Sequence, residues 1–534
     1  MSAITPQTEL RLLKCPIEED NRNQLTFANE TAQFTYFNSL PSIDCENFTY
    51  QRKDSIIRFP DHIDNIIGYN YVMYKNEAYT DKWFYGFITN MEYVNDHMTY
   101  ITIKTDVFQT WQFDIVYKKS FIEREHVNDD SLGKNTIPEN LETGDVISQS
   151  VVTKNYGTFY PCIAVSEDIL RSDQTIYHHN YNGVVSGLTF IALKTSADVN
   201  YFIFRYNQSS KIDAINSIFM IPDSYLPTGN WSTDSTGLIN YKYITEQDTP
   251  FDLGSQDITK PTILGEGTTG YTPKNNKLFT FPYCYILADN NAGTNVIYRY
   301  EDFETPTGAT AGTCRFKCIG TINTGCSIKF IPINYKNISE NYNESFNGAK
   351  LPLGGWINDV YTNWLRQNGV NIAINLAGSA LQIIGGIGLS GTGAGSVAGG
   401  GQIASGITGV ANTLGQIYQH SLIPNQAEGN VNSSDIMFSA GKIGCSIYKM
   451  SLKIEYLKII DQFFSTYGYK VNQVKLPNVT GRTNWNYVKT IDCNLEGDIP
   501  EKDIQELKDI FNKGITFWHN PTTYLDYSVT NAIV

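Results

Sequence analysis

Charged residues are scarce in this 534-residue chain. Asp, Glu, Lys and Arg together make up 18% of it, against about 25% in typical globular proteins. The net charge is −14, and the Lys and Arg residues form no cluster. A basic cluster is what releases counterions from phosphates and drives tight nucleic-acid binding. The sequence therefore excludes a DNA-binding protein of the usual basic type, although an acidic wall suits double-stranded DNA that passes without binding.

The chain also lacks the marks of secretion and of catalysis. No basic region followed by an apolar one opens the sequence, so no signal peptide is expected. No P-loop, no Gly-x-Ser-x-Gly elbow and no His-Glu-x-x-His motif occurs. A catalytic carboxylate pair cannot be chosen among 54 acidic residues. We therefore expect no enzymatic activity and no cofactor.

Disulfides are not expected either. The nine cysteines are an odd number and most of them stand alone, whereas a disulfide framework is dense in cysteine and belongs to small secreted domains. The spacing Cys314-x3-Cys318-x7-Cys326 invites a zinc site, but no fourth ligand is spaced to match. Buried free thiols are the favoured interpretation, and no metal site is predicted.

Aromatic residues and glycine are plentiful, which favours a β-rich chain with many turns. Aromatics make up 13% of the residues. A compact aromatic run predicts a strand over 83–89, and alternation of apolar and polar residues predicts one over 99–105, with a further strand over 111–116. One clear amphipathic helix is predicted over 498–513, opened by Pro500 and ended by Gly514. The expected fold class is mainly β with some α (α+β), in several domains.

Four regions are expected along the chain. They are residues 1–140 and 430–534, which form the N- and C-terminal parts of one β-rich domain, a β-rich middle domain over 141–335, and an apolar loop with its stems over 336–429. Short apolar runs such as 162–165, 189–193 and 201–204 are assigned to strands of the middle domain. The charge run 123–126 is expected to be a solvated strand end.

The most unusual feature is a segment without charge. No Asp, Glu, Lys or Arg occurs between Arg366 and Glu428, and these 61 residues hold 14 of the 42 glycines. Two arms, 370–389 and 397–418, flank a Gly- and Ser-rich tip. A helical arm of about 20 residues would be about 30 Å long, the thickness of the hydrocarbon core of a bilayer.

Each arm has an apolar stripe and a polar one at helical spacing. The residues expected to insert into a membrane are Ile372, Leu376, Ile383, Ile384, Ile387, Leu389, Ile403, Ile407, Val410, Leu414 and Ile417. Those expected to face a pore are Asn371, Asn375, Gln382, Gln402, Asn412 and Gln416.

Three interpretations of this segment are open: a buried pair of structural helices, a flexible loop and a membrane-active hairpin. Interior glycines weaken a helix in water by about 0.5–1 kcal/mol each relative to Ala. In lipid the backbone must bond to itself, and small residues allow helices to approach closely. The absence of charge removes the largest cost of insertion. The membrane-active hairpin is therefore favoured.

Several longer motifs resemble a known family. They are 82–85 (KWFY), 106–111 (DVFQTW) and 120–126 (SFIEREH), followed in order by 467–470 (YGYK), 486–488 (NYV), 497–499 (GDI) and 514–519 (GITFWH). Together they resemble the tail knob, or distal tail tube, proteins of small short-tailed phages of Gram-positive bacteria (the Picovirinae type). The resemblance covers roughly 70–126 and 365–534, and the uncharged segment stands where that family carries a membrane-active loop.

The resemblance implies a structural virion protein at the tip of the tail, assembled in the host cytoplasm. It implies a homo-hexameric tube, attached to other tail or collar proteins, whose six loops plug the lumen until infection. The loops would then penetrate the host cytoplasmic membrane while the genome is ejected through the tube. Two alternatives from other classes are a tail-associated cell-wall hydrolase and a receptor-binding tail spike.

Overall fold

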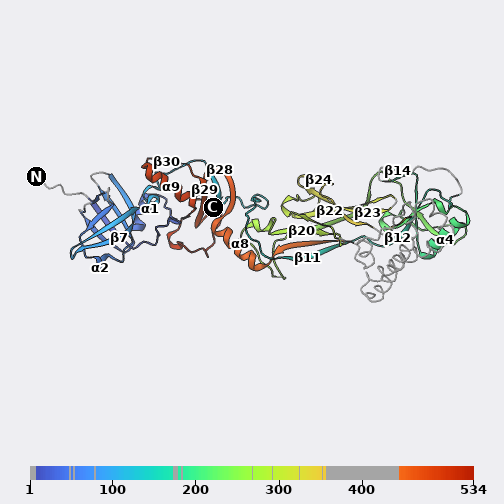
Figure 1. Cartoon of the computed structure of the whole chain (residues 1–534), viewed down its shortest axis with the longest axis horizontal. Helices are drawn as coiled ribbons and strands as arrows, with labels where there is room; N and C mark the ends of the chain where they lie inside the picture. Colours follow the sequence, from blue (N-terminus) through green and yellow to red (C-terminus); the bar gives the residue numbers. More distant parts are fainter. Residues whose placement is uncertain are drawn as a thin grey trace, which may run out of the picture. The chain divides into compact units, whose positions relative to one another are not determined.

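The computed structural model describes residues 8–355 and 444–534, apart from short gaps at 47, 49, 52–54, 77–79, 172–178, 182–183, 268, 292, 324 and 351–352. The described residues fold as two compact units. The first is drawn from Met1–Thr143, Pro273–Leu278 and Glu455–Val534, and the second from Gly144–Thr272 and Phe279–Ile454. Strands predominate in both (Figure 1). The predicted fold class, mainly β with some α, is confirmed.

The first unit contains an antiparallel sheet of the order β3-β1-β6-β7-β8-β5-β4. Its strands are β1 (Thr8–Leu13), β3 (Ser42–Glu46), β4 (Tyr50–Gln51), β5 (Ile56–Phe59), β6 (Tyr71–Asn76), β7 (Thr80–Asn95) and β8 (Met98–Thr105). The predicted strands at 83–89 and 99–105 lie in β7 and β8, which pair with each other. Buried and half-buried residues alternate along β8, as period 2 requires.

A second sheet of this unit joins the two ends of the chain. Its order is β2-β31-β29-β10-β28, with β2 (Asn23–Leu25), β10 (Ser120–Glu125), β28 (Tyr469–Lys475), β29 (Trp485–Asp492) and β31 (Ile515–Trp518). The N-terminal strand β2 runs parallel to β31, and β10 lies between β28 and β29. In Figure 1 the red α9 and β29 lie beside the blue N-terminal strands of the same unit.

The helix α9 (Glu501–Lys513) covers one face of this second sheet. Pro500 precedes it and Gly514 ends it, at φ 98°, which confirms the predicted amphipathic helix. Leu507, Ile510 and Phe511 are buried in one cluster with Ile122 and Val488 of the sheet. Polar residues occupy the outer face of the helix, so burial of the apolar stripe is what holds it against the strands.

Aromatic side chains fill the core between the two sheets of this unit. Phe37 of α1 (Glu30–Asn38) lies 4.7 Å from Tyr85 and 5.6 Å from Tyr71, measured between ring centroids. Trp485 and Trp518 lie 5.1 Å apart. All of these rings are at most 2% exposed. Tilted and offset rings at such distances add roughly 0.5–1.5 kcal/mol per pair beyond the area that they bury.

The strand predicted over 111–116 is wrong. Residues Val107–Trp111 form the short helix α3, because the Asp106 carboxylate accepts a hydrogen bond from the Gln109 N–H at 3.0 Å and caps the helix. Only Val116–Tyr117 (β9) is strand, paired with β30 (Leu495–Glu496). The other helices of the unit are α2 (Ile63–Ile66) and most of α8 (Ile454–Tyr467).

The described residues of the second unit form three larger sheets and one hairpin. Their orders are β11-β27-β20-β21, β17-β18-β15-β12-β16-β26, β19-β22-β23-β24 with β25 beside β23, and β13-β14. The strands are β11 (Val146–Asn155), β12 (Phe159–Val165), β13 (His179–Tyr181), β14 (Val184–Ser186), β15 (Thr189–Leu193), β16 (Ile215–Pro222), β17 (Ser232–Thr233), β18 (Asn240–Tyr243), β19 (Phe251–Thr259), β20 (Cys284–Asp289), β21 (Asn295–Tyr298), β22 (Thr313–Ile322), β23 (Cys326–Tyr335), β24 (Ile338–Glu340), β25 (Phe346–Lys350), β26 (Leu353–Gly355) and β27 (Gly444–Leu452).

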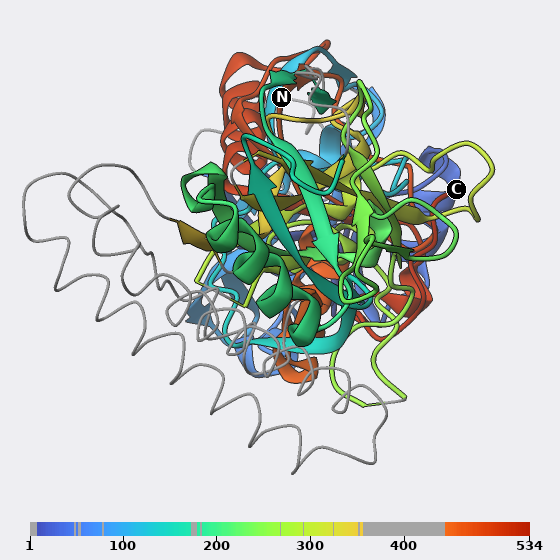
Figure 2. The same ribbon diagram turned by 90° about the vertical axis from the view of Figure 1, so that its right-hand side faces the viewer.

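The run 201–204 is helical, which corrects the predicted strand. It belongs to α4 (Ser196–Gln208), which lies across the sheet that contains β12 (Figure 2). Thr195 and Asp198 form a capping box at its start, which satisfies the first free backbone donors. Val199, Phe202, Ile203 and Tyr206 share one buried cluster with the sheet. Their spacing is that of one helical face, so packing overrides the β propensity of the aromatic run.

Candidate functional site

The predicted membrane-inserting and pore-facing residues lie outside the described residues, as does the whole segment 356–443. The strands on either side of that segment belong to the second unit. Among the described strands, β26 pairs with β16 alone, at the edge of its sheet, whereas β27 lies between β11 and β20. Within the described part of the chain, no helix is both long enough and apolar enough to cross a membrane.

The charge run 123–126 of the resemblance motif is not the solvated strand end that the sequence predicts. Glu125 is 0% exposed and His126 is 2% exposed. The Glu125 carboxylate forms an ion pair with Lys475 and accepts a hydrogen bond from the Asn478 N–H at 2.9 Å. Glu123 and Arg124, earlier in the run, are half-buried, and Glu123 pairs with Lys489, so it is the end of the run that is removed from water.

Glu139 is the centre of a buried ionic cluster in the first unit. Its side chain is fully buried and pairs with both Arg124 and Lys277. It also accepts a hydrogen bond from the Lys470 N–H at 2.9 Å. Arg124 in turn donates to the Gly468 carbonyl at 2.8 Å. Two cations and one carboxylate are thus buried together, an arrangement that folds only when every member has its partners.

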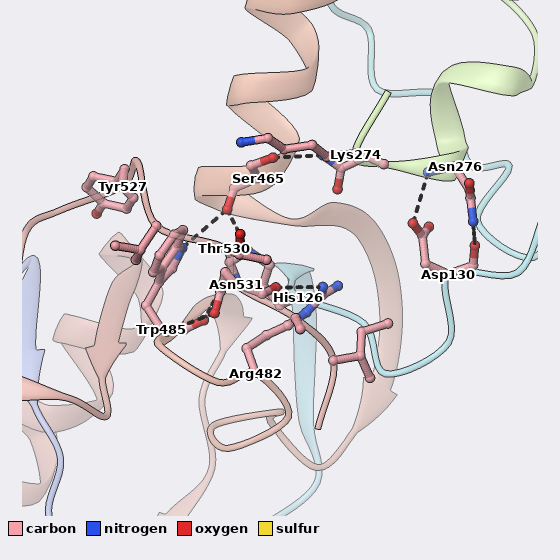
Figure 3. Close-up of a pocket in the computed structure, with 14 residues that line it drawn as sticks. His126, Asp130, Lys274, Asn276, Ser465, Arg482, Trp485, Tyr527, Thr530 and Asn531 are labelled. Carbon is pink, nitrogen blue, oxygen red and sulfur yellow. Dashed lines mark hydrogen bonds between the residues drawn. The ribbon is translucent and has the colours of Figure 1, made fainter. Parts of the chain in front are cut away.

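A pocket of about 440 Å³ lies in the same unit (Figure 3). Residues from five parts of the chain line it, among them His126, Asp130, Lys274, Ser465, Arg482 and Asn531. The turn at 274–276 is held by carboxylates. Asp461 accepts from the backbone N–H groups of Lys274 and Asn275 at 2.8 and 3.1 Å, and Asp130 accepts from the Asn276 N–H at 2.9 Å.

His126 is neutral in this pocket. Burial, together with the nearby Arg482 guanidinium, lowers its pKa from 6.5 to about 3. Its Nδ1 accepts a hydrogen bond from the Tyr487 N–H at 2.8 Å, and the other ring nitrogen faces the Ser465 carbonyl at 3.1 Å. The tautomer that satisfies both contacts carries its proton on Nε2, which donates to Ser465. His126 therefore fixes α8 against β29, and it has no free nitrogen for acid–base work.

The C-terminal segment forms one wall of the pocket. Asn531 accepts hydrogen bonds from the Asn484 and Trp485 N–H groups at 3.0 and 3.1 Å, and its amide donates to the Trp485 carbonyl at 2.7 Å. The Thr483 N–H donates to the Ala532 carbonyl at 3.0 Å. These bonds hold the C-terminal segment against the start of β29.

The three clustered cysteines are buried free thiols, as predicted. Cys314 and Cys318 project from the buried face of β22, and Cys326 begins β23. Burial raises the pKa of each of the three to about 12. Across the described residues no group of three or more His, Cys, Asp or Glu side chains is arranged to hold a metal ion.

Known proteins match this chain over almost its whole length. The family model for the C-terminal domain of the Bacillus phage phi29 tail knob protein gp9 matches residues 241–532. The chain belongs to the phage tail knob family. A second model, the N-terminus of caudoviral major tail proteins, matches residues 6–118. A tail knob protein is a structural component of the virion tail, so the broad function predicted from the sequence is confirmed.

Two relatives and one solved structure illustrate the likeness to other tail knobs. The tail knob protein gp9 of Bacillus phage phi29 is 27% identical and that of Bacillus phage B103 is 26% identical, each over 98% of both chains. The structure of the bacteriophage C1 tail knob protein gp12 superposes with a TM-score of 0.62 at 13% identity. It covers 99% of this chain and 100% of that one, which shows that the tail knob fold extends over both units.

Sequence reasoning missed the buried residues of this tail knob that bind one another. Glu139, Lys277, Arg482 and Asn531 carry no local signal, because their partners are distant side chains and backbone carbonyls. The family motifs did indicate which strands near these residues lie together. The 120–126 motif lies in β10 and the loop after it, and the 467–470, 486–488 and 514–519 motifs contribute to the adjacent β28, β29 and β31.

Proposed function

We propose that this tail knob protein forms the distal conduit for genome ejection, and that its residues 367–427 leave the particle and penetrate the host cytoplasmic membrane. The observation that carries the proposal is the 61-residue segment without Asp, Glu, Lys or Arg. Membership of the tail knob family supports a place in the tail. Many apolar groups exposed to water would cause aggregation, so the segment would be sheltered in the virion until contact with the cell.

The proposed conduit is a homo-hexamer of this chain, joined to other tail or collar proteins. Net charge supports passage of DNA without tight binding, since a chain of −14 repels phosphate. Sedimentation equilibrium should give the mass of a hexamer. A monomer at every concentration, even with tail partners present, would contradict the proposed homo-hexamer. A dissociation constant for duplex DNA below about micromolar at physiological salt would contradict the proposal that DNA passes without tight binding.

In the membrane, the apolar stripes of several copies would face lipid. The uncharged polar stripes, which include Asn375, Gln402 and Asn412, would face water at less cost than buried charges. The pore would be long enough to cross the bilayer core, because each arm spans about 30 Å when helical.

Release of a dye from liposomes by the assembled full-length protein tests the membrane step. The double substitution Ile383→Asp and Ile407→Asp should abolish release and leave assembly intact, because each charge at the bilayer centre costs about 2.5–3.5 kcal/mol. The matched control Ile383→Leu and Ile407→Leu keeps the stripe apolar and should release dye as the natural protein does. Failure of the natural protein to bind or permeabilise any bilayer under any trigger would leave the segment a structural plug.

The same preparation separates this proposal from a cell-wall hydrolase. The proposed protein has no enzymatic activity, so it should leave peptidoglycan intact in a zymogram. Clearing that survives the Asp substitutions would indicate an enzyme.

A further inference from the structure

The pocket of the first unit holds an arginine whose charge is not matched by a carboxylate. Arg482 makes no ion pair within 4 Å of any described residue. Its Nη2 donates to the Val127 carbonyl at 3.0 Å and its Nη1 to the Asn531 carbonyl at 3.4 Å. Its Nε is buried and has no hydrogen-bond partner in the described part of the chain. A guanidinium has five N–H donors; Nε is shut off from the pocket, and the bonds to Val127 and Asn531 use one hydrogen each of Nη2 and Nη1.

The surroundings of Arg482 leave the pocket positive. Lys274 also lines it, and its ammonium group has no ion pair with a described residue. Asp130 is the one acidic residue of the lining, and its oxygens are occupied by the Tyr469 hydroxyl at 2.7 Å and the Asn276 N–H at 2.9 Å. His126 is uncharged at neutral pH because its pKa is lowered to about 3. The pocket is therefore lined by two cations, Arg482 and Lys274, and by one carboxylate, Asp130, which already accepts two hydrogen bonds.

The excess positive charge of the pocket is unfavourable without a bound anion, because Arg482 is partly buried. Desolvation lowers the pKa of the Arg482 guanidinium, and the charge of Asp130 acts in the opposite direction. A buried donor without an acceptor destabilises the folded chain, and more so when it is charged. An anion in the pocket that accepts from the second hydrogens of Nη1 and Nη2 would offset the charge of this guanidinium. Figure 3 shows Arg482 and Lys274 on opposite sides of the pocket, with His126 and Asn531 between them in that view.

The lining indicates which kind of anion fits. Beside the polar groups stand the aliphatic side chains of Val529, Ala532 and Ile533, which suit a small organic body. A carboxylate matches the planar fork of a guanidinium and carries a single charge. A phosphate dianion would face stronger repulsion from Asp130. The volume of about 440 Å³ is within the range of small-molecule sites.

We propose that this pocket binds a small organic carboxylate, with the Arg482 guanidinium as its main partner and the Lys274 ammonium as the second cation. The site is independent of the membrane segment, since all of its residues belong to the first unit. The C-terminal segment would be one wall of the site, so a bound carboxylate would hold that segment against β29.

Binding of butyrate to the full-length protein, followed by ligand-observed NMR, tests the site. Butyrate should bind saturably with a dissociation constant of about 10 mM or tighter, a range open to a ligand of this size. Butyramide has the same shape without the charge and should bind at least about tenfold more weakly, since a charge-assisted hydrogen bond contributes about 1.5–3 kcal/mol. Inorganic phosphate should also bind more weakly than butyrate.

Three variants assign the binding to this pocket. Arg482→Lys keeps the charge but loses the fork, and should weaken butyrate binding about tenfold or more. Lys274→Gln changes an exposed side chain and should weaken butyrate binding severalfold. Arg22→Lys is the matched control, because Arg22 lies on the surface of the same unit away from this pocket, and its binding should equal that of the natural protein.

Four outcomes would overturn the proposal. They are equal binding of butyrate and butyramide, tighter binding of phosphate than of butyrate, natural affinity in Lys274→Gln together with natural affinity in a folded Arg482→Lys, and no saturable binding of butyrate. Thermal unfolding of each variant shows whether it is folded. If Arg482→Lys does not fold, the Lys274→Gln variant and the comparison of the two ligands decide.

Discussion

Glu139 and Lys277 form an ion pair in which both side chains are almost completely buried, although they are 138 residues apart in the sequence. Lys277 belongs to Pro273–Leu278, a short stretch that the chain contributes to the first unit between two long passages through the second. Desolvation lowers the pKa of Lys277, and Glu139 opposes that change. The pair therefore exists as a charged pair only while the first unit is folded.

Replacement of Glu139 by Gln should destabilise the first unit by about 3–5 kcal/mol, because it leaves Arg124 and Lys277 buried without a counter-charge. Chemical denaturation followed by tryptophan fluorescence measures this. The control is Glu496→Gln, which removes the exposed partner of Lys118 and should cost less than about 1 kcal/mol. Equal effects of the two substitutions would mean that the buried cluster does not contribute to stability.

The stability of the first unit should fall as the pH falls below about 6.5, and His126 should account for much of this. Its pKa is about 3 in the folded chain and about 6.5 when unfolded. Between these values the unfolded state binds the proton and the folded state does not, so acid favours unfolding. At pH 5 the loss from His126 is about 2 kcal/mol.

Comparison of the natural protein with His126→Gln between pH 7 and pH 5 isolates this contribution. Asp106, whose pKa burial raises to about 6, acts in the opposite direction in both proteins and cancels in the difference. The variant should be less stable at pH 7 and should have the shallower dependence of its unfolding free energy on pH. Parallel curves would show that His126 is not the titrating group.

Asn531→Ala should release the C-terminal segment. The substitution removes three hydrogen bonds to the backbone of Asn484 and Trp485, at a cost of about 2–3 kcal/mol. Chymotrypsin should then cleave after Tyr524 or Tyr527 in the variant faster than in the natural protein. Ser528→Ala, which removes an exposed contact to Asp526, should leave the cleavage rate unchanged. A variant that resists cleavage like the natural protein would show that other contacts hold the segment.

One cysteine should react readily in the folded protein. Eight of the nine thiols are buried, and Cys45 alone is partly exposed. A thiol-specific reagent should therefore modify about one thiol per chain under native conditions and all of them after denaturation. Cys45→Ser should remove the native reaction. Modification of two or more thiols before unfolding would contradict the packing around β22 and β23.

Periodicity in the sequence was sufficient for β8 and α9, because each buries one face and exposes the other, and an aromatic run was sufficient for β7. It failed at α3 and α4, where aromatic runs resemble strands. The deciding residues were nonetheless present, since Asp106 caps α3 and the pair Thr195 and Asp198 forms the capping box of α4. A capping signal ahead of an apolar run therefore deserved more weight than the β propensity of the run.

The buried charges could not be predicted in the same way. The sequence predicts that Glu125 and His126 are exposed to solvent, because no partner lies near them in the chain. Their partners Lys475 and Tyr487 belong to strands about 350 residues further along. The pocket has the same origin, since Arg482 and Lys274 both line it from positions about 200 residues apart in the sequence. A local sequence pattern describes one helix or strand, whereas the net charge of a site depends on side chains that several elements contribute.

The two strands that flank residues 356–443 differ in how they would respond to a pull. β26 has three residues and one neighbour at a sheet edge, whereas β27 has nine residues and a neighbour on each side. Tension along the chain would unzip the few backbone bonds of β26 first, while β27 must break two ladders at once. Among the described residues the unit thus has a weak attachment at β26 and a strong one at β27, so a mechanical load would open β26 first and leave β27 in place.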